Sequence, residues 1–258
     1  MSWFYDILQR IMTFVVSQII TIPFAKWPFQ DLKHPMKSYE MQEAMNLRIR
    51  VKDSQEIGAW FLQPFEKPDL PQDSDEQYQP RQGFIIQENE TVILYLHGNA
   101  ATRSQYHRRE LYRILQKMGY YVLAIDYRGY GDSSWISPTQ SSMAEDAKAA
   151  FNWLVENSHP SANIYIWGHS LGTGVTSKLA HILNTENVAR SFSGLILEAP
   201  FNRMLDEVQS FKASRLLPMI GMDIRATLAK ADMSFDSTHW LSQIEDKPIF
   251  IMHAEDDE

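Results

Sequence analysis

The fold of this 258-residue chain can be read from one stretch, Tyr165-Ile166-Trp167-Gly168-His169-Ser170-Leu171-Gly172-Thr173-Gly174. An apolar, strand-like segment passes through Gly-x-Ser-x-Gly into a helix-like segment, and this order is typical of a nucleophile elbow. Such a bend holds a serine hydroxyl, here that of Ser170, out beyond the end of a strand. Gly168 and Gly172 flank the serine because side chains on the crowded sides of the bend would clash. The helix that follows points its free N–H groups and its dipole at any negative charge that develops there.

Backbone N–H groups near Ser170 are candidates for an oxyanion hole, the set of donors that stabilises a negatively charged oxygen during acyl transfer. The N–H of Leu171 is one candidate, since this residue follows the serine directly. The second donor is expected in the loop His97-Gly98-Asn99-Ala100-Ala101, at the N–H of Asn99 or Ala100. His97 is interpreted as a hydrogen-bonding residue that organises this loop and not as a base. One donor of this kind is worth about 3 kcal/mol where it has been tested.

From Thr91 onward, short apolar runs alternate with helical stretches. This rhythm predicts an α/β fold with a mostly parallel sheet and helices on both faces. The apolar runs are 92–96, 121–125, 164–167, 195–197 and 249–252, and the helical stretches are about 103–118, 142–157 and 171–184. An alternating pattern over 45–63 predicts a hairpin before them. In such sheets the functional residues collect beyond the carboxyl ends of the strands.

Charged residues near two of these strand ends are interpreted mainly as structural. The loop Asp126-Tyr127-Arg128-Gly129-Tyr130-Gly131-Asp132-Ser133 is expected to be a rigid turn with internal salt bridges, with lining of a pocket as the alternative. Arginines in the helical stretch 103–118 are expected to form a solvated face, with attraction to an anionic head group or membrane surface as the alternative. These arginines are Arg103, Arg108, Arg109 and Arg113.

Residues 201–245 do not fit the strand rhythm and are interpreted as a cap inserted at the carboxyl edge of the sheet. Their apolar side chains are expected to line a slot for an acyl chain or to pack on the core, and the two roles are compatible. They include Phe211, Leu216, Leu217, Pro218, Met219, Ile220, Met222 and Phe235. Residues 64–90 are rich in Pro, Asp, Gln and Glu and are expected to form a mobile loop.

The last apolar run, 249–252, leads into His253-Ala254-Glu255-Asp256-Asp257. A carboxylate in the turn after this strand would hold a histidine in the right tautomer and stabilise its imidazolium form. Asp257 is favoured over Asp256 because it fits the spacing His-Gly-x-x-Asp. We therefore expect Asp257 to be the acid that works with Ser170.

Composition limits both the partners and the chemistry. The net charge is -8 and no long basic block is present, which argues against nucleic acid as a partner. The absence of cysteine excludes disulfides, Cys-based zinc sites and a thiol nucleophile. No cluster of histidines and carboxylates has the spacing of metal ligands, so neither a metal nor another cofactor is expected.

Residues 1–29 carry apolar residues at helical spacing, with aromatic residues at both ends. The longest charge-free run, 11–25, is shorter than the roughly 20 apolar residues that a membrane span needs. An amphipathic helix lying in a membrane interface is therefore favoured. A helix packed on the domain and a tilted span are the alternatives.

A series of motifs makes the chain resemble an α/β-hydrolase, and more closely the membrane-associated monoacylglycerol and lysophosphatidylserine lipases. They are His97-Gly98-Asn99, Asp126-Tyr127-Arg128-Gly129-x-Gly, Gly168-His169-Ser170-Leu171-Gly172, Glu198-Ala199-Pro200-Phe201 and His253-Ala254-Glu255-Asp256-Asp257. The resemblance implies an α/β-hydrolase domain over residues 45–258 that hydrolyses the ester of a single-chain lipid through an acyl-enzyme. It also implies association with a membrane, that of the endoplasmic reticulum.

The sequence departs from the family's pattern at its end. In this fold the triad histidine follows the acid, but the sequence as given ends at Glu258, before the final strand and helix of the fold. None of the 8 histidines is a convincing substitute. Without a base a serine is a weak nucleophile at neutral pH, so the chain as given is expected to be nearly inactive. A thioesterase that cleaves acyl groups from protein cysteines, and a non-catalytic membrane or interaction protein, are the alternative functions.

Overall fold

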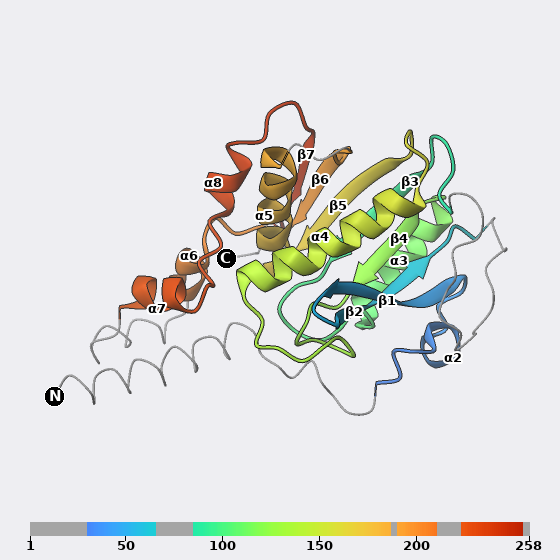
Figure 1. Ribbon diagram of the computed structural model, residues 1–258, viewed down its shortest axis with the longest axis horizontal. Helices are drawn as coiled ribbons and strands as arrows, with labels where there is room; N and C mark the ends of the chain where they lie inside the picture. Colours follow the sequence, from blue (N-terminus) through green and yellow to red (C-terminus); the bar gives the residue numbers. More distant parts are fainter. Residues whose placement is uncertain (1–29, 66–84, 187–189, 211–222, 255–258) are drawn as a thin grey trace.

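The computed structural model describes residues 30–65, 85–186, 190–210 and 223–254 of the chain. Within them, a seven-stranded sheet has the strand order β1-β2-β4-β3-β5-β6-β7 (Figure 1). β2 runs antiparallel to both β1 and β4, and the other neighbouring strands are parallel. The strands span Ala44–Lys52 (β1), Gln55–Leu62 (β2), Thr91–Leu96 (β3), Tyr121–Ile125 (β4), Asn163–His169 (β5), Gly194–Glu198 (β6) and Ile249–Met252 (β7). The mostly parallel α/β sheet expected from the sequence is confirmed.

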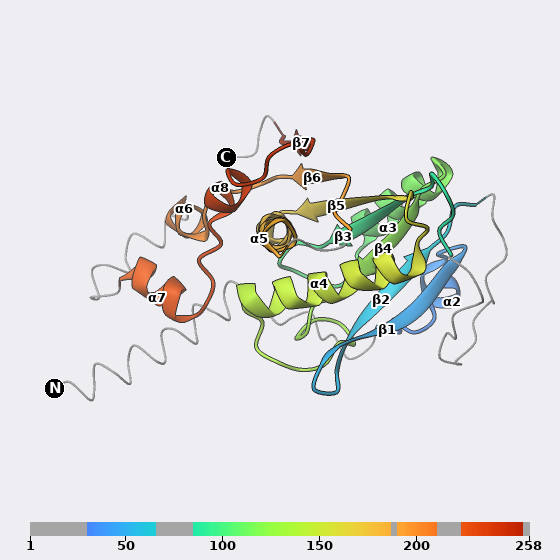
Figure 2. The ribbon, with the colours of Figure 1, turned by 45° about the horizontal axis from the view of Figure 1, so that its top comes forward.

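Helices cover both faces of this sheet (Figure 2). α2 and α3 pack on one face, and α4 and α5 pack on the other. Successive side chains of a strand point to opposite faces of the sheet, so alternate residues pack against the helices of one face or of the other. In β2, Phe61 joins the core beneath α4 and α5, whereas Trp60 joins the core beneath α3. The described helices span Pro35–Tyr39 (α2), Tyr106–Lys117 (α3), Gln140–Asn157 (α4), Leu171–Thr185 (α5), Met204–Ser210 (α6), Ile224–Lys230 (α7) and Ser237–Leu241 (α8).

The elements follow the sequence pattern closely. The hairpin is confirmed, with Ala44 opposite Leu62 in its register, and each apolar run coincides with one of the strands β3 to β7. One helix is shorter than expected, because α3 begins at Tyr106. The residues before it form a turn instead, in which the Gln105 N–H donates to the Thr102 carbonyl at 3.1 Å.

The described part of segment 201–245, the predicted cap, packs on the main core. Met233 and Phe235 are fully buried there, and the Phe235 ring meets the Phe201 ring edge to face at 6.2 Å. Packing between cap and core is therefore present. The other apolar cap residues, which lie within 211–222, fall outside the described residues, as do 1–29 and most of 64–90. No helix in the described ranges combines the length and the apolar character needed to cross a bilayer.

Candidate active site

Ser170 stands at the junction of β5 and α5 in a strained backbone conformation. Its φ is 50° and its ψ is -119°, which is costly for a residue with a side chain and persists only when the surroundings hold it. Two elements do so. The Ser170 N–H donates to the Glu198 carbonyl at 2.9 Å, and the Thr173 hydroxyl donates to the Ser170 carbonyl at 2.7 Å. The sharp strand-to-helix bend expected from Gly-x-Ser-x-Gly is present.

Gly172 allows α5 to begin directly against the end of β3. A Cβ added to Gly172 would lie 2.0 Å from the Leu96 carbonyl oxygen, and one added to Gly168 would lie 2.4 Å from the Gly172 carbonyl oxygen. Real Cβ atoms do not approach backbone so closely, so both positions require glycine at this packing density. The two glycines lie where the elbow motif places them.

The loop after β3 lies against the elbow. A Cβ added to Gly98 would be only 3.3 Å from the Ser170 Cβ, so the backbone of this loop touches the candidate nucleophile. Asn99 and Ala100 follow Gly98, and neither of their N–H groups donates to an acceptor within the described ranges. Leu171 is the first residue of α5, where an N–H has no acceptor inside the helix. Gly98, which precedes the expected donors Asn99 and Ala100, therefore lies against Ser170, and Leu171 follows Ser170 directly.

His97 is fully buried at the start of this loop. Its Nδ1 donates to the Gly98 carbonyl at 2.7 Å, and its Nε2 lies 3.3 Å from the Asp126 carboxylate. Burial lowers the pKa of the His97 imidazole, although Asp126 acts in the opposite direction. Through its contacts with the Gly98 carbonyl and with Asp126, the ring organises the loop as expected.

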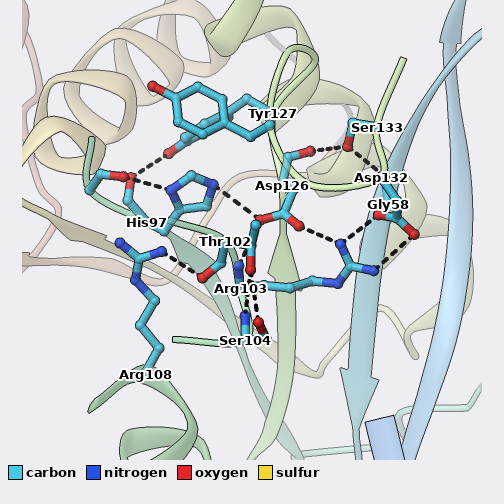
Figure 3. Close-up of polar contacts among 12 residues, drawn as sticks. Gly58, His97, Thr102, Arg103, Ser104, Arg108, Asp126, Tyr127, Asp132 and Ser133 are labelled. Carbon is cyan, nitrogen blue, oxygen red and sulfur yellow. Dashed lines mark hydrogen bonds and ion pairs between the residues drawn. The ribbon is translucent and has the colours of Figure 1, made fainter. Parts of the chain in front are cut away.

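Arg103 forms the centre of a buried ion network beside the loop (Figure 3). Its guanidinium is fully buried and pairs with Asp126 and with Asp132, the latter at 2.8 Å. The Arg103 N–H also donates to Asp126 at 2.7 Å. Burial acts to raise the pKa of the Asp126 carboxyl, but Arg103 and His97 outweigh it and hold that pKa below its usual range.

These contacts correct two expectations. Arg103 and Arg108 do not belong to a solvated face, because both are buried. Arg103 precedes the helix and is neutralised by carboxylates, and Arg108 lies on the side of α3 that faces the sheet, with Tyr112 and Leu115. The loop 126–133 is held mainly by ion pairs to other elements, among them Arg128 with Asp146 of α4 at 2.5 Å.

The remaining arginines of α3 bind a second helix. Arg109 and Arg113 each donate to the Tyr39 carbonyl at 3.1 Å, at the end of α2. Before α2, the Gln30 side chain accepts a hydrogen bond from the Thr102 hydroxyl at 2.9 Å. The described chain thus begins in contact with the loop that neighbours Ser170.

The structure does not identify a base or an acid for Ser170. All 8 histidines lie in the described ranges. His169 adjoins Ser170, yet its ring faces that of His107 at 5.7 Å. Asp257 lies outside the described residues, as does Asp256. The described side chains also contain no group of three or more potential metal ligands.

Comparison with known proteins assigns the chain. Residues 87–250 match the family described as serine aminopeptidase, S33. The chain belongs to this family. A crystal structure of an alpha-beta hydrolase from Vibrio vulnificus has a TM-score of 0.68 at 20% identity, over 93% of this chain and 75% of that one. The esterase Pf2001 of Pyrococcus furiosus has a TM-score of 0.55 at 19% identity, over 82% and 70%. The α/β-hydrolase fold inferred from the motifs is confirmed.

Relatives of this S33-family chain carry a lipase name. The chain is 33% identical over 255 residues to the lysophosphatidylserine lipase ABHD12 of Danio rerio. It is 34% identical over 257 residues to the protein of the same name in Xenopus tropicalis. Each alignment covers 97% of this chain and 64% of the relative. Protein ABHD12B of Homo sapiens is 30% identical over 250 residues, which is 94% of this chain and 66% of that protein. The chain thus spans less than two thirds of the two lipases.

The close packing at the elbow predicts that Gly172→Ala is costly. The added Cβ would meet the Leu96 carbonyl at 2.0 Å, so backbone must shift, and we expect a loss of about 3 kcal/mol in the free energy of unfolding, measured by urea titration. Gly119→Ala is the control, because Gly119 has φ 84° but open space around its Cβ. It should cost about 1–2 kcal/mol. Equal losses in the two variants would show that the contact with β3 is unimportant.

The depressed pKa of His97 predicts a pH-dependent stability. The unfolded ring takes up a proton near its ordinary pKa of 6.5, but the buried ring resists it. This contribution is present above pH 6.5 and is lost as the pH falls toward the folded-state pKa, with a slope of up to about 1.4 kcal/mol per pH unit. The urea midpoints measured at neutral and at mildly acidic pH should therefore differ less in His97→Asn than in the wild type. His239→Asn, at an exposed histidine, should retain the wild-type slope, and an unchanged slope in His97→Asn would refute the assignment.

Proposed function

We propose that this chain supplies the nucleophile and the oxyanion hole of a serine hydrolase that cleaves the ester bond of a single-chain lipid. The observation that carries the proposal is the backbone of Ser170, held at φ 50° and ψ -119° at the N-terminus of α5. Strain at such a position supports a catalytic role, because it presents the hydroxyl while leaving helix N–H groups free for a developing charge.

The proposed reaction uses the groups around Ser170 in turn. The Ser170 Oγ attacks the ester carbonyl carbon while its proton passes to a base, and the carbonyl oxygen becomes an oxyanion. The N–H of Leu171 and that of Asn99 or Ala100 stabilise this oxyanion. The alcohol then leaves with the proton from the base, and the acyl group stays on Ser170 until water releases it as a fatty acid. Asp257 is the proposed acid that orients the base.

The proposed reaction needs a general base, and the 258-residue sequence departs from the family's pattern at this group. Because the sequence pattern offers no convincing base among the 8 histidines, we infer that this chain reacts slowly by itself. Loss of one member of a catalytic triad costs on the order of 10⁴ to 10⁶ in turnover. A small base that diffuses to the elbow, such as imidazole, would then restore part of the reactivity.

Two observations support a lipid ester as the substrate. The relatives at 33% and 34% identity are named lysophosphatidylserine lipases, which favours a lysophospholipid. The cap also brings apolar side chains to the elbow helix, since a Cβ on Gly174 would meet the Phe235 ring at 2.6 Å and the Phe201 ring at 2.9 Å. A monoacylglycerol is the second lipid candidate, and an acyl thioester is the alternative outside the lipids.

Membrane association belongs to the same proposal. A lysophospholipid is amphiphilic and resides at a membrane surface, and the named relatives act on such a lipid. The apolar and aromatic spacing of residues 1–29 supports an amphipathic helix that binds the membrane interface. We place the protein at the endoplasmic reticulum on the strength of the motif resemblance, with the hydrolase domain over residues 45–258 and its cap at about 201–245.

Covalent labelling tests the nucleophile. A fluorophosphonate probe should label the wild type at Ser170 faster when imidazole is added, and Ser170→Ala should not be labelled. Ser210→Ala, at an exposed serine of the cap, should behave as the wild type. If the probe labels Ser170 neither with nor without imidazole, the serine is not activated. A non-catalytic binding role then becomes the better account.

Hydrolysis assays test the substrate class. The assays contain imidazole, and the rate of Ser170→Ala is subtracted as background. Lysophosphatidylserine and monoacylglycerol should be hydrolysed at least tenfold faster than an acyl-thioester peptide, because a binding site matched to its substrate discriminates by about this factor or more. Faster cleavage of the thioester would move the assignment to thioesterases.

A further inference from the structure

We propose that Arg108, a buried arginine on α3, is a positioning residue that fixes the backbone of the loop 97–102 for oxyanion binding. The inference rests on the proposed function, because it concerns the same loop. Within the described residues Arg108 forms no hydrogen bond or ion pair with Ser170, so it would act through the loop and not on the substrate.

Arg108 holds the loop through two carbonyl oxygens. Its Nη1 donates to the Thr102 carbonyl and its Nη2 donates to the Ala100 carbonyl, each at 2.7 Å. Figure 3 shows the guanidinium reaching from α3 to Thr102. Because the peptide group is planar, fixing the Ala100 carbonyl fixes the whole peptide plane that follows it. Only the two backbone torsions of Ala100 then separate this plane from the Ala100 N–H, one of the proposed oxyanion donors.

The charge of Arg108 is placed where structure alone gives little reason for it. The residue is only 2% exposed, and no carboxylate in the described ranges forms an ion pair with it. Arg103 is equally buried, but Asp126 and Asp132 neutralise it. A buried cation is costly unless its donors are used. Besides the Tyr95 side chain, Arg108 binds the Thr102 and Ala100 carbonyls of this loop. A role in setting the loop accounts for that arrangement.

The loop needs such a restraint. Ala101 adopts φ 63°, a left-handed conformation that is unfavourable for a residue with a side chain. On the far side of Ala101, Asp126 holds the Arg103 N–H at 2.7 Å, and at the start of the loop the His97 ring holds the Gly98 carbonyl at 2.7 Å. Arg108 restrains the loop between these two points. Among the described residues, no acceptor binds the Asn99 or Ala100 N–H. A planar fork suits two carbonyls at once, and a lysine ammonium does not reproduce it.

The test compares Arg108→Lys with Arg109→Lys. Arg109 is the next residue of the same helix and binds the Tyr39 carbonyl, away from the loop, so both variants keep the charge. The rate at which a fluorophosphonate labels Ser170 is measured in the presence of imidazole at several probe concentrations. These data give the maximal labelling rate and the probe concentration at half-saturation. We expect the maximal rate to fall about 10- to 100-fold in Arg108→Lys, somewhat less than the loss of a whole oxyanion donor, with half-saturation within about twofold. Arg109→Lys should stay within about twofold in both.

A second readout does not depend on catalysis. Hydrogen exchange of a peptide covering 98–105 should accelerate in Arg108→Lys and not in Arg109→Lys, because the Arg103 and Gln105 N–H groups in it are hydrogen-bonded in the wild type. If Arg108→Lys does not fold, Arg108→Gln replaces it, since the amide keeps a donor for one carbonyl and removes the buried charge.

The outcomes separate the two proposals. Equal labelling rates in Arg108→Lys and Arg109→Lys, with equal exchange of 98–105, would overturn the role of Arg108 while leaving the proposed function standing. If the wild type is not labelled at Ser170 even with imidazole, the proposed function fails, and the exchange comparison still decides whether Arg108 holds the loop. A lower maximal labelling rate together with a higher half-saturating probe concentration in both variants would show a general loss of structure and would also overturn the proposal.

Discussion

The Arg103 guanidinium lies fully buried between the carboxylates of Asp126 and Asp132, and three parts of the chain depend on this contact. Arg103 ends the loop beside Ser170, and the two aspartates belong to the loop after β4. The hairpin joins them through Ser133, whose hydroxyl accepts from the Gly58 N–H at 2.9 Å and donates to the Asp126 carbonyl at 2.7 Å. Removing one partner of such a buried pair leaves an uncompensated charge and costs about 3–5 kcal/mol. Strands that are distant in sequence are therefore stabilised as one unit.

The strained elbow rests on this unit. The Tyr127 hydroxyl, one residue after Asp126, donates to the His97 carbonyl at 3.1 Å. The same carbonyl oxygen is among the atoms closest to the α5 start, 2.9 Å from a Cβ added to Gly172. Strain persists where the surrounding structure determines the conformation several times over, and here the ion network fixes the strand end against which the elbow packs. The conformation of Ser170 thus depends on the packed sheet edge as well as on its own motif.

Periodicity and turn chemistry were sufficient to predict the sheet, the hairpin and the elbow, since each depends on residues close together in the sequence. The buried arginines were not predictable in this way. Arg103 and Arg108 follow the helical pattern of α3 in sequence, and charge patterning assigns such residues to the surface. Their burial depends on partners from other elements, with Asp126 and Asp132 lying 23 and 29 residues away from Arg103. A useful sequence signal is an arginine at the inward spacing of a helix, as Arg108 is with Tyr112 and Leu115. The roles of Asp257 and of residues 1–29 stay predictions, because both lie outside the described residues.

The hydrogen bond from Thr102 to Gln30, at 2.9 Å, gives the protein a fixed point of attachment. Residues 1–29 join the folded body at Gln30, beside the loop that neighbours Ser170, and the Leu32 carbonyl that follows accepts from the Trp60 indole at 2.8 Å. A force applied through the N-terminal segment therefore enters the body next to the reactive edge of the sheet. If residues 1–29 bind a membrane as proposed, attachment at Gln30 keeps the edge that carries Ser170 near that membrane.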